Sequence, residues 1–254
     1  MTMQTWNDVR SQTLDMATSC TVFTPESMGR PGASDPALLI LLHGLTGNHA
    51  VWAVRTDLQA LADKHHMVIV LPDGERSFWI DQEYGLKWGT WVGEELPALV
   101  RRTMRVSDTR AKTFIGGLSM GGYGAFRAAF DHPETFAGAF SLSGVLDVSE
   151  DAFRTRHGDL YEIGFGNPDS PRPQDDLVER LRNKKQVTRL HHSHFFACCG
   201  EDDALINMNR VFVDAAKAVH LNLVYRESAG EHNYRYWNEW LPVALDKIVG
   251  LPDQ

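Results

Sequence analysis

The short stretch at residues 117–121, which reads Gly-Leu-Ser-Met-Gly, constrains the fold more than any other part of the chain. It is a G-x-S-x-G motif with an apolar, β-prone run before it (112–116) and a helix-compatible run after it (122–130). A strand, a sharp turn and a helix in this order form a nucleophile elbow, which exposes the serine hydroxyl. The alternative is an ordinary glycine-rich turn with Ser119 at the start of a helix.

The β/α alternation of the chain predicts a mostly parallel sheet with helices on both faces. Residues 11–23 alternate as a half-buried strand does, with Leu14, Met16, Cys20 and Val22 on one face. Further strands are expected at 37–42, 67–71, 112–116, 136–142, 195–199 and 221–226, and helices at 51–64, 93–105, 122–130, 207–220 and 233–249. In the helix at 51–64, Val54, Leu58, Leu61 and Ala62 have helical spacing. We predict a single domain over 1–254, in which 147–190 is a cap-like insertion.

Charge, cysteine content and the distribution of apolar residues argue against several classes of protein and partner. The formal net charge is −8, which disfavours nucleic acid and anionic membranes as partners. Three cysteines, two of them adjacent, imply no disulfide framework. The polar N-terminus lacks the apolar region of a secretory signal, and no apolar run reaches the ~20 residues of a membrane span, so a cytoplasmic location is expected.

The loops after the later strands supply the groups that a serine nucleophile needs. A serine hydroxyl needs a base, usually histidine, and the base needs an acidic group to orient it. The run Glu201-Asp202-Asp203 follows strand 195–199, and His232 follows strand 221–226. Serine, acid, histidine is the chain order of an α/β-hydrolase, so it supports the elbow independently. Spacing alone does not choose among the three acids.

Two backbone N–H groups are expected to form an oxyanion hole. One belongs to Met120, directly after the nucleophile, and the other to Leu45, after strand 37–42. The aromatic loop at 78–91 is either a hydrophobic cluster or the wall of an apolar pocket. The pocket residues that we predict are His43, Trp52, Trp79 and Trp88. The cluster His191, His192 and His194 lacks the spacing of a metal site, so no metal is expected.

Four motifs together resemble the esterase D / tributyrin esterase family, which includes S-formylglutathione hydrolases. They are LHGLTG at 42–47, GLSMGGYGA at 117–125, CGEDDAL at 199–205 and GEHNYRYW at 230–237. The resemblance covers about residues 10–249 and implies an α/β-hydrolase fold. It also implies a small-molecule ester substrate, no metal or organic cofactor, and formation of homo-oligomers.

The same resemblance implies roles for individual residues. It identifies Ser119 as the nucleophile, His232 as the base and, through the pattern C-G-x-x-D-x-L, Asp203 as the acid. Gly47 stands where S-formylglutathione hydrolases usually carry cysteine, which disfavours that activity. The insertion 147–190, which is expected to shape the acyl or leaving-group pocket, matches no pattern of the family.

These observations predict a serine carboxylesterase for short-chain acyl esters. A thioesterase of the S-formylglutathione hydrolase type would use the same groups. An acyltransferase would pass the acyl group to a sugar or alcohol instead of water. A binding protein that has lost catalysis is the remaining class, and the complete serine, acid and histidine order argues against it.

Overall fold

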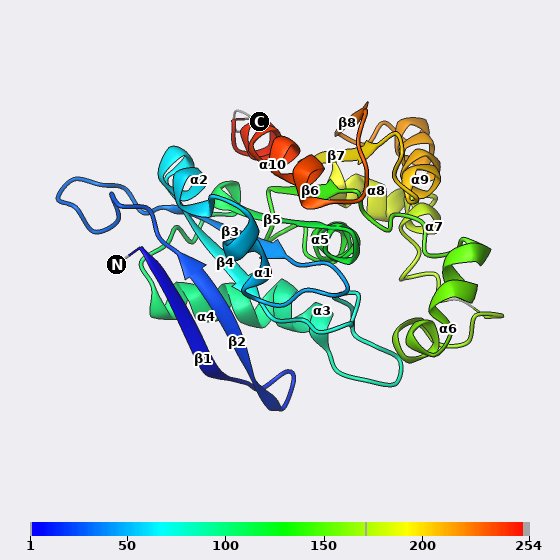
Figure 1. Ribbon diagram of the computed structural model, residues 1–254, viewed down its shortest axis with the longest axis horizontal. Helices are drawn as coiled ribbons and strands as arrows, with labels where there is room; N and C mark the ends of the chain where they lie inside the picture. The colour runs from blue at the N-terminus through cyan, green and yellow to red at the C-terminus, as the bar shows by residue number, and fades with distance from the viewer. Residues whose placement is uncertain (1, 171, 251–254) are drawn as a thin grey trace.

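The computed structural model describes residues 2–170 and 172–250, which fold around one eight-stranded sheet (Figure 1). The strand order is β1-β2-β4-β3-β5-β6-β7-β8. The strands are β1 (Met3–Ser11), β2 (Met16–Phe23), β3 (Ala37–Leu42), β4 (Met67–Pro72), β5 (Thr113–Leu118), β6 (Gly138–Leu142), β7 (His194–Gly200) and β8 (Leu223–Ser228). β4, β3 and β5 to β8 are parallel, whereas β1 and β2 are antiparallel to their neighbours. The predicted mostly parallel sheet is therefore confirmed.

The N-terminal edge of the sheet differs from the prediction. β1 was not predicted, because most of its side chains are exposed and leave no alternating apolar pattern. Within the predicted strand 11–23, Leu14 lies in the turn between β1 and β2, although it is buried as expected. The strand itself starts only at Met16.

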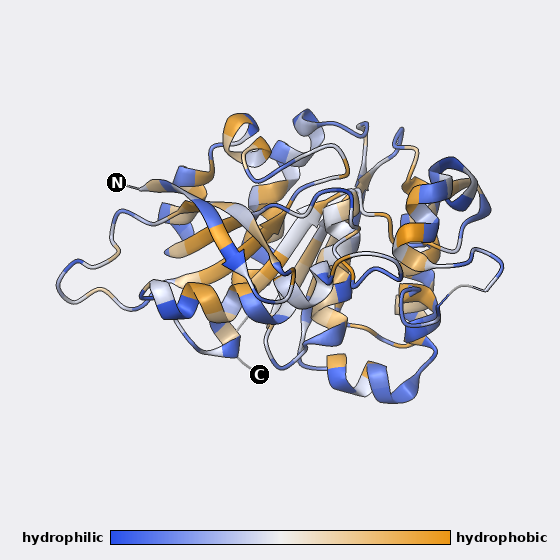
Figure 2. Ribbon diagram, turned by 90° about the horizontal axis from the view of Figure 1, so that it is seen from below, coloured by the Kyte–Doolittle hydropathy of each residue, from blue (hydrophilic) through white to orange (hydrophobic). Residues whose placement is uncertain are grey.

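Side chains of the central strands point alternately into two hydrophobic cores. Leu38, Ile40 and Leu42 of β3 belong to one core, and Leu39 and Leu41 belong to the other. A strand covered on both faces must be apolar throughout, as this one is. Figure 2 shows the resulting concentration of hydrophobic residues on the strands in the middle of the molecule.

Helices cover both faces of the sheet (Figure 1). α1 (Val51–Arg55), α2 (Leu58–His65) and α10 (Tyr234–Val249) pack on one face. α4 (Leu96–Thr103), α5 (Met120–Asp131) and α9 (Ile206–Ala218) pack on the other. Three shorter helical segments lie between β4 and β5. They are α3 (Trp88–Thr90), the π-helical turn η1 (Trp91–Glu95) and the 3₁₀ turn η2 (Arg110–Lys112).

Two of the predicted helices need correction. The helix predicted at 51–64 is interrupted at Thr56, which is extended, and Asp57 caps a new helix by accepting a hydrogen bond from the Ala60 N–H. Val54, predicted on the buried face, is therefore 78% exposed. The helix predicted at 93–105 already starts at Trp88 and contains a π-helical turn just before Pro97. Proline has no N–H to donate to the carbonyl four residues earlier, which favours such an irregularity.

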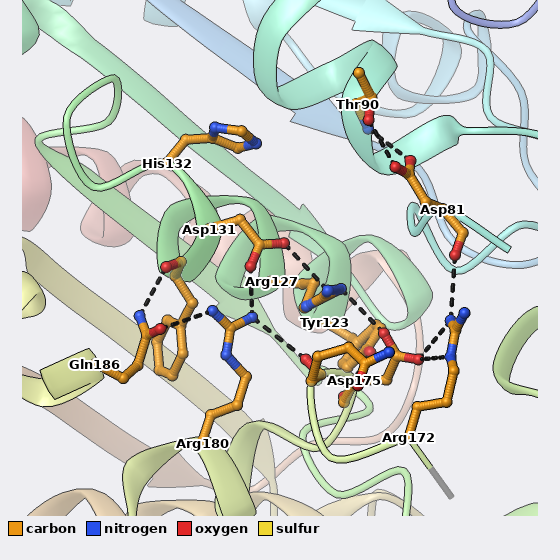
Figure 3. A network of polar contacts seen from close by, with 12 residues as sticks. Asp81, Thr90, Tyr123, Arg127, Asp131, His132, Arg172, Asp175, Arg180 and Gln186 are labelled. Atoms are coloured by element: carbon orange, nitrogen blue, oxygen red, sulfur yellow. Dashed lines mark hydrogen bonds and ion pairs between the residues drawn. The ribbon is translucent and has the colours of Figure 1, made fainter. Parts of the chain in front are cut away.

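The insertion 147–190 contains α6 (Asp151–Phe165), α7 (Leu177–Leu181) and α8 (Lys184–Leu190). A polar network ties it to α5 (Figure 3). The Arg127 guanidinium lies 3.1 Å from Asp175 Oδ1, and the Tyr123 hydroxyl donates to the Asp175 carbonyl at 2.7 Å. Arg180 pairs with Asp131 at 2.7 Å. The buried Asp175 carboxylate pairs with both Arg127 and Arg172, so a costly unpaired charge would remain only if both partners were removed. The network therefore fixes the insertion against the helix that follows Ser119.

A second polar contact fixes the β1–β2 hairpin. The carboxylate of Glu95 accepts hydrogen bonds from Ser11 Oγ at 2.7 Å, from the Gln12 N–H at 2.9 Å and from the Thr13 N–H at 3.0 Å. Burial by itself raises the pKa of Glu95, but these hydrogen bonds outweigh burial and hold the pKa below its ordinary value.

We expect Glu95→Gln to lower the free energy of unfolding at pH 7 by about 1 kcal/mol, because the amide cannot accept all three hydrogen bonds. A lowered folded-state pKa stabilises the fold above the unfolded value of about 4.3, and this stabilisation is lost as the pH falls through the folded value. The difference from the wild type should therefore shrink from pH 7 towards pH 3 in urea titrations. The exposed neighbour Glu94 provides the control, Glu94→Gln, and an equal effect of both variants would contradict the prediction.

In the described ranges, no helix has the length and apolar character needed to cross a membrane.

Candidate active site

Ser119 occupies a strained turn between β5 and α5. Its backbone angles, φ 55° and ψ −120°, are unfavourable for any residue with a side chain. A Cβ atom on Gly117 would lie 2.6 Å from the carbonyl of Gly121, and one on Gly121 would lie 2.5 Å from the Leu42 carbonyl oxygen. The two glycines of the motif are therefore needed for the close passage of β5, α5 and β3.

The side chains of Ser119, His232 and Asp203 form a continuous hydrogen-bonded chain. His232 Nε2 lies 3.0 Å from Ser119 Oγ, and His232 Nδ1 lies 2.9 Å from Asp203 Oδ2. The Asp203 side chain is fully buried, whereas the imidazole of His232 is 34% exposed. This is the geometry in which a histidine can remove a proton from a serine while an acid orients it. Glu201 and Asp202 form no such contact and are exposed.

Two loops at the carboxyl ends of β7 and β8 bring Asp203 and His232 together. The Glu201 N–H donates to the Ser228 carbonyl at 2.9 Å, and the Asp202 N–H donates to the Gly230 carbonyl at 3.0 Å. A Cβ atom on Gly200 would collide with the Gly230 carbonyl. Glycine at position 200 thus allows the two loops to approach closely.

The surroundings of Asp203 keep it ionised. Burial by itself raises the pKa of Asp203, but hydrogen bonding to His232, the charge of its imidazolium form and donation from the Leu205 N–H and the Ser143 side chain lower it below its ordinary value. The Trp237 indole N–H in turn donates to Ser143 Oγ at 3.1 Å. The Trp237 ring also meets the His232 ring edge-on, with centroids 5.0 Å apart. Trp237 therefore contacts the histidine directly and the acid through Ser143.

The predicted oxyanion donors lie next to Ser119. Met120 is the first residue of α5, and Leu45 follows β3; both line the cavity that contains Ser119. Across residues 2–170 and 172–250, neither N–H donates a hydrogen bond to another protein group. Two such N–H groups can bind a carbonyl oxygen that becomes negatively charged.

The cavity beside Ser119 has a volume of about 650 Å³. Its walls come from the loop after β3, from α1, from α6 in the insertion and from the start of α10. Phe78, from the aromatic loop considered as a possible pocket wall, does line the cavity. Most of the other side chains were not predicted individually; they include Arg55, Phe153, Arg156, His157, Tyr234 and Trp237. Trp237 could have been predicted as a site residue, because it belongs to the GEHNYRYW motif and lies in the first helical turn after His232. Arg156 and His157 carried no such signal, because the insertion matches no pattern.

The prediction that His43, Trp52, Trp79 and Trp88 line the pocket needs correction. All four are at most 1% exposed and lie behind the cavity wall. The indole N–H groups of Trp52 and Trp79 donate to the carbonyls of Leu42 and His43, each at 3.1 Å. These tryptophans are therefore supports of the turn that carries Leu45, and Trp88 belongs to the hydrophobic core.

His43 supports the same turn. Its Nε2 accepts a hydrogen bond from the Gly74 N–H at 3.2 Å, so Nδ1 carries the proton and donates to the Gly44 carbonyl at 2.7 Å. Burial lowers the pKa of His43, which agrees with a neutral imidazole in this position.

No group of three or more His, Cys, Asp or Glu side chains in the described part of the chain is arranged to hold a metal ion. His194 instead meets Asn222, with Nδ1 2.7 Å from the amide nitrogen.

The sheet, the strained serine turn and the chain order of Ser119, Asp203 and His232 define an α/β-hydrolase. The chain belongs to the Esterase family, described as putative esterase, whose pattern matches residues 11–248. The resemblance found in the sequence motifs is therefore confirmed at the level of the family, and at that level the chain is an ester hydrolase.

Three similar proteins illustrate this membership. An acetyl esterase from Caldicellulosiruptor saccharolyticus is 32% identical over 223 residues, covering 85% of this chain and 84% of its own. The Staphylococcus aureus fluorophosphonate-binding serine hydrolase FphF has a TM-score of 0.86 at 25% identity and covers 97% of this chain and 98% of its own. The S-formylglutathione hydrolase FrmB from Staphylococcus aureus has a TM-score of 0.84 at 26% identity, over 98% of this chain and 100% of its own.

Proposed function

We propose that this protein is a serine carboxylesterase that hydrolyses short-chain acyl esters. The observation that carries the proposal is the hydrogen-bonded chain from Ser119 through His232 to Asp203. Ser119 Oγ attacks the ester carbonyl while His232 Nε2 takes its proton. The N–H groups of Leu45 and Met120 bind the oxyanion, a contribution of about 3 kcal/mol for each donor.

Three further proton transfers by His232 complete the reaction. The imidazolium gives its proton to the leaving alcohol, and the acyl group stays on Ser119 as an ester. His232 then takes a proton from water, which attacks the acyl-enzyme, and returns a proton to Ser119 Oγ as the carboxylic acid leaves. Asp203 stays ionised throughout and stabilises the imidazolium.

The apolar walls of the cavity support a short acyl chain as substrate, and so does the similarity to an acetyl esterase. A thioester is the second candidate, supported by the similarity to an S-formylglutathione hydrolase. Specificity constants for 4-nitrophenyl esters of increasing acyl length, measured beside S-formylglutathione, would distinguish the two.

Covalent labelling tests the proposed nucleophile directly. A fluorophosphonate should add once to the protein, and peptide mass spectrometry should find the adduct on Ser119. Hydrolysis of 4-nitrophenyl acetate should fall in proportion to labelling. An adduct on another residue, or full activity after complete labelling, would contradict the proposal.

Trp237 is expected to position the acid and the base. Trp237→Phe keeps an aromatic ring against His232 but removes the hydrogen bond to Ser143. We expect kcat to fall about tenfold with little change in KM, since one hydrogen bond to the site is lost. Trp240→Phe is the matched control. Trp240 lies on the same helix as Trp237 but outside the cavity, and its indole N–H makes a similar hydrogen bond, to Ser228 Oγ. Equal kcat values for both variants would refute this role.

A further inference from the structure

The cavity beside Ser119 has a positively charged lining in a chain whose formal net charge is −8. Its charged side chains are Arg55 and Arg156, opposed by a single carboxylate, Asp203. That carboxylate already accepts hydrogen bonds from His232 and from the Leu205 N–H. The charge that remains for a ligand in this cavity is therefore positive.

The two guanidinium groups lack ion-pair and hydrogen-bond partners in the described parts of the chain. Arg55 lies over the ring of Tyr234, 5.6 Å from its centroid, and within residues 2–170 and 172–250 its guanidinium makes no ion pair and no hydrogen bond. The Arg55 backbone carbonyl accepts a hydrogen bond from Asn238. The side chain of Arg156 makes no ion pair and no hydrogen bond within the described ranges. By contrast, the nearby Arg154 pairs with Asp151 on the same helix. The arginines at the cavity thus keep their donors free.

His157 lies beside Arg156 in the wall formed by the insertion and adds no positive charge of its own. His157 also lines the cavity and packs against Phe153, with ring centroids 4.6 Å apart. Burial lowers the pKa of His157, and the charges of Arg156 and Arg76 lower it further. The two charges that lower the pKa of His157 are both positive, and of these Arg156 lines the cavity.

Most of the rest of the wall is apolar. It includes Val51, Phe78, Leu118, Val145 and Trp237. A matching ligand combines an apolar body with a negatively charged group. Guanidinium groups bind carboxylates through paired, charge-assisted hydrogen bonds, which suits them to this task.

We propose that the natural ester carries a carboxylate, on its acyl or its alcohol part, that Arg55 and Arg156 bind. This inference rests on the proposed esterase function, because the same cavity contains Ser119. It goes further by assigning a charge to the substrate and by naming two residues that select it.

Two pairs of esters, each matched in shape, test the proposal. For the acyl side, 4-nitrophenyl hemisuccinate is compared with 4-nitrophenyl 4-methylpentanoate. For the alcohol side, 4-acetoxybenzoate is compared with 4-acetoxybenzamide. We expect the anionic member of at least one pair to have a kcat/KM about tenfold higher, mainly through a lower KM, with the preference decreasing at high salt.

Neutral variants then assign the preference to individual residues. Arg55→Gln and Arg156→Gln should each lower kcat/KM for the preferred anionic ester about three- to tenfold, with little change for its neutral partner. Arg102→Gln is the control, since it removes the same charge from an exposed site on α4 outside the cavity. A preference in the first pair of esters places the carboxylate on the acyl part of the substrate, and a preference in the second pair places it on the alcohol part.

The outcomes separate this inference from the proposed function. Hydrolysis of neutral and anionic esters at equal rates, or equal behaviour of all three arginine variants, would overturn the inference and leave the esterase function standing. Absence of hydrolysis for all four esters by the folded protein would overturn both.

Discussion

Replacing Ser119 by alanine is expected to reduce kcat for 4-nitrophenyl acetate by a factor on the order of 10⁵, because the attacking atom is lost and only binding and oxyanion stabilisation remain. The fold should be retained. The Ser119 hydroxyl has no hydrogen-bond partner besides His232 in the described residues. Residual activity above about one per cent of the wild type would contradict the assignment of Ser119 as nucleophile.

A companion variant separates catalysis from backbone strain. Alanine at position 119 must still adopt a φ of 55°, whereas glycine adopts this conformation without a Cβ clash. We therefore expect Ser119→Gly to be as inactive as Ser119→Ala but more resistant to unfolding, by about 1 kcal/mol in urea titrations. Equal stability of the two variants would show that the turn stores no strain at Ser119.

The sheet and the position of its catalytic edge were predictable because both follow from local patterns. The short, wholly apolar runs at 37–42 and 67–71 are typical of strands covered on both faces, and the structure places strands there. The loops that follow the strands carry Ser119, Asp203 and His232, since parallel strands bring their carboxyl ends to one edge of the sheet. Chain order was therefore enough to predict Ser119 as the nucleophile and His232 as the base.

The cavity wall was not predictable, because burial of an aromatic side chain depends on tertiary packing. Trp52 and Trp79 each have an N–H that needs a partner and a large apolar surface. Both needs can be met at a pocket surface or behind it, and the structure meets them behind it, on the carbonyls of Leu42 and His43. Arg156 belongs to an insertion that is held in place by aromatic packing and by the network around Asp175 (Figure 3). No sequence periodicity encodes such long-range contacts.

The choice among Glu201, Asp202 and Asp203 shows the same limit at a smaller scale. Three consecutive carboxylates are equivalent in spacing, and the tight turn after β7 decides which one turns inwards. The Asp203 N–H donates to the Gly200 carbonyl, and its side chain is buried against His232. The backbone of Asp202 is instead bonded to Gly230, and its side chain is exposed.

Asp203→Asn is expected to lower kcat about 10⁴-fold without disturbing the fold. The asparagine oxygen can still accept the hydrogen bond from the Leu205 N–H, so its amide NH₂ group faces His232 Nδ1. Nδ1 must then act as acceptor, and the proton moves to Nε2. In that tautomer, Nε2 can no longer take the proton of Ser119.

Asp202→Asn is the matched control, one residue away and with the same loss of charge. Its exposed carboxylate makes no contact with His232, so activity should stay within about twofold of the wild type, as for most surface substitutions. Initial rates with 4-nitrophenyl acetate and near-ultraviolet circular dichroism of both folded variants provide the comparison. A large loss in Asp202→Asn, or more than a tenth of wild-type activity in Asp203→Asn, would move the role of the acid away from Asp203. Because both variants change the net charge equally, a difference between them comes from the buried contacts of Asp203, of which His232 is the one that reaches Ser119.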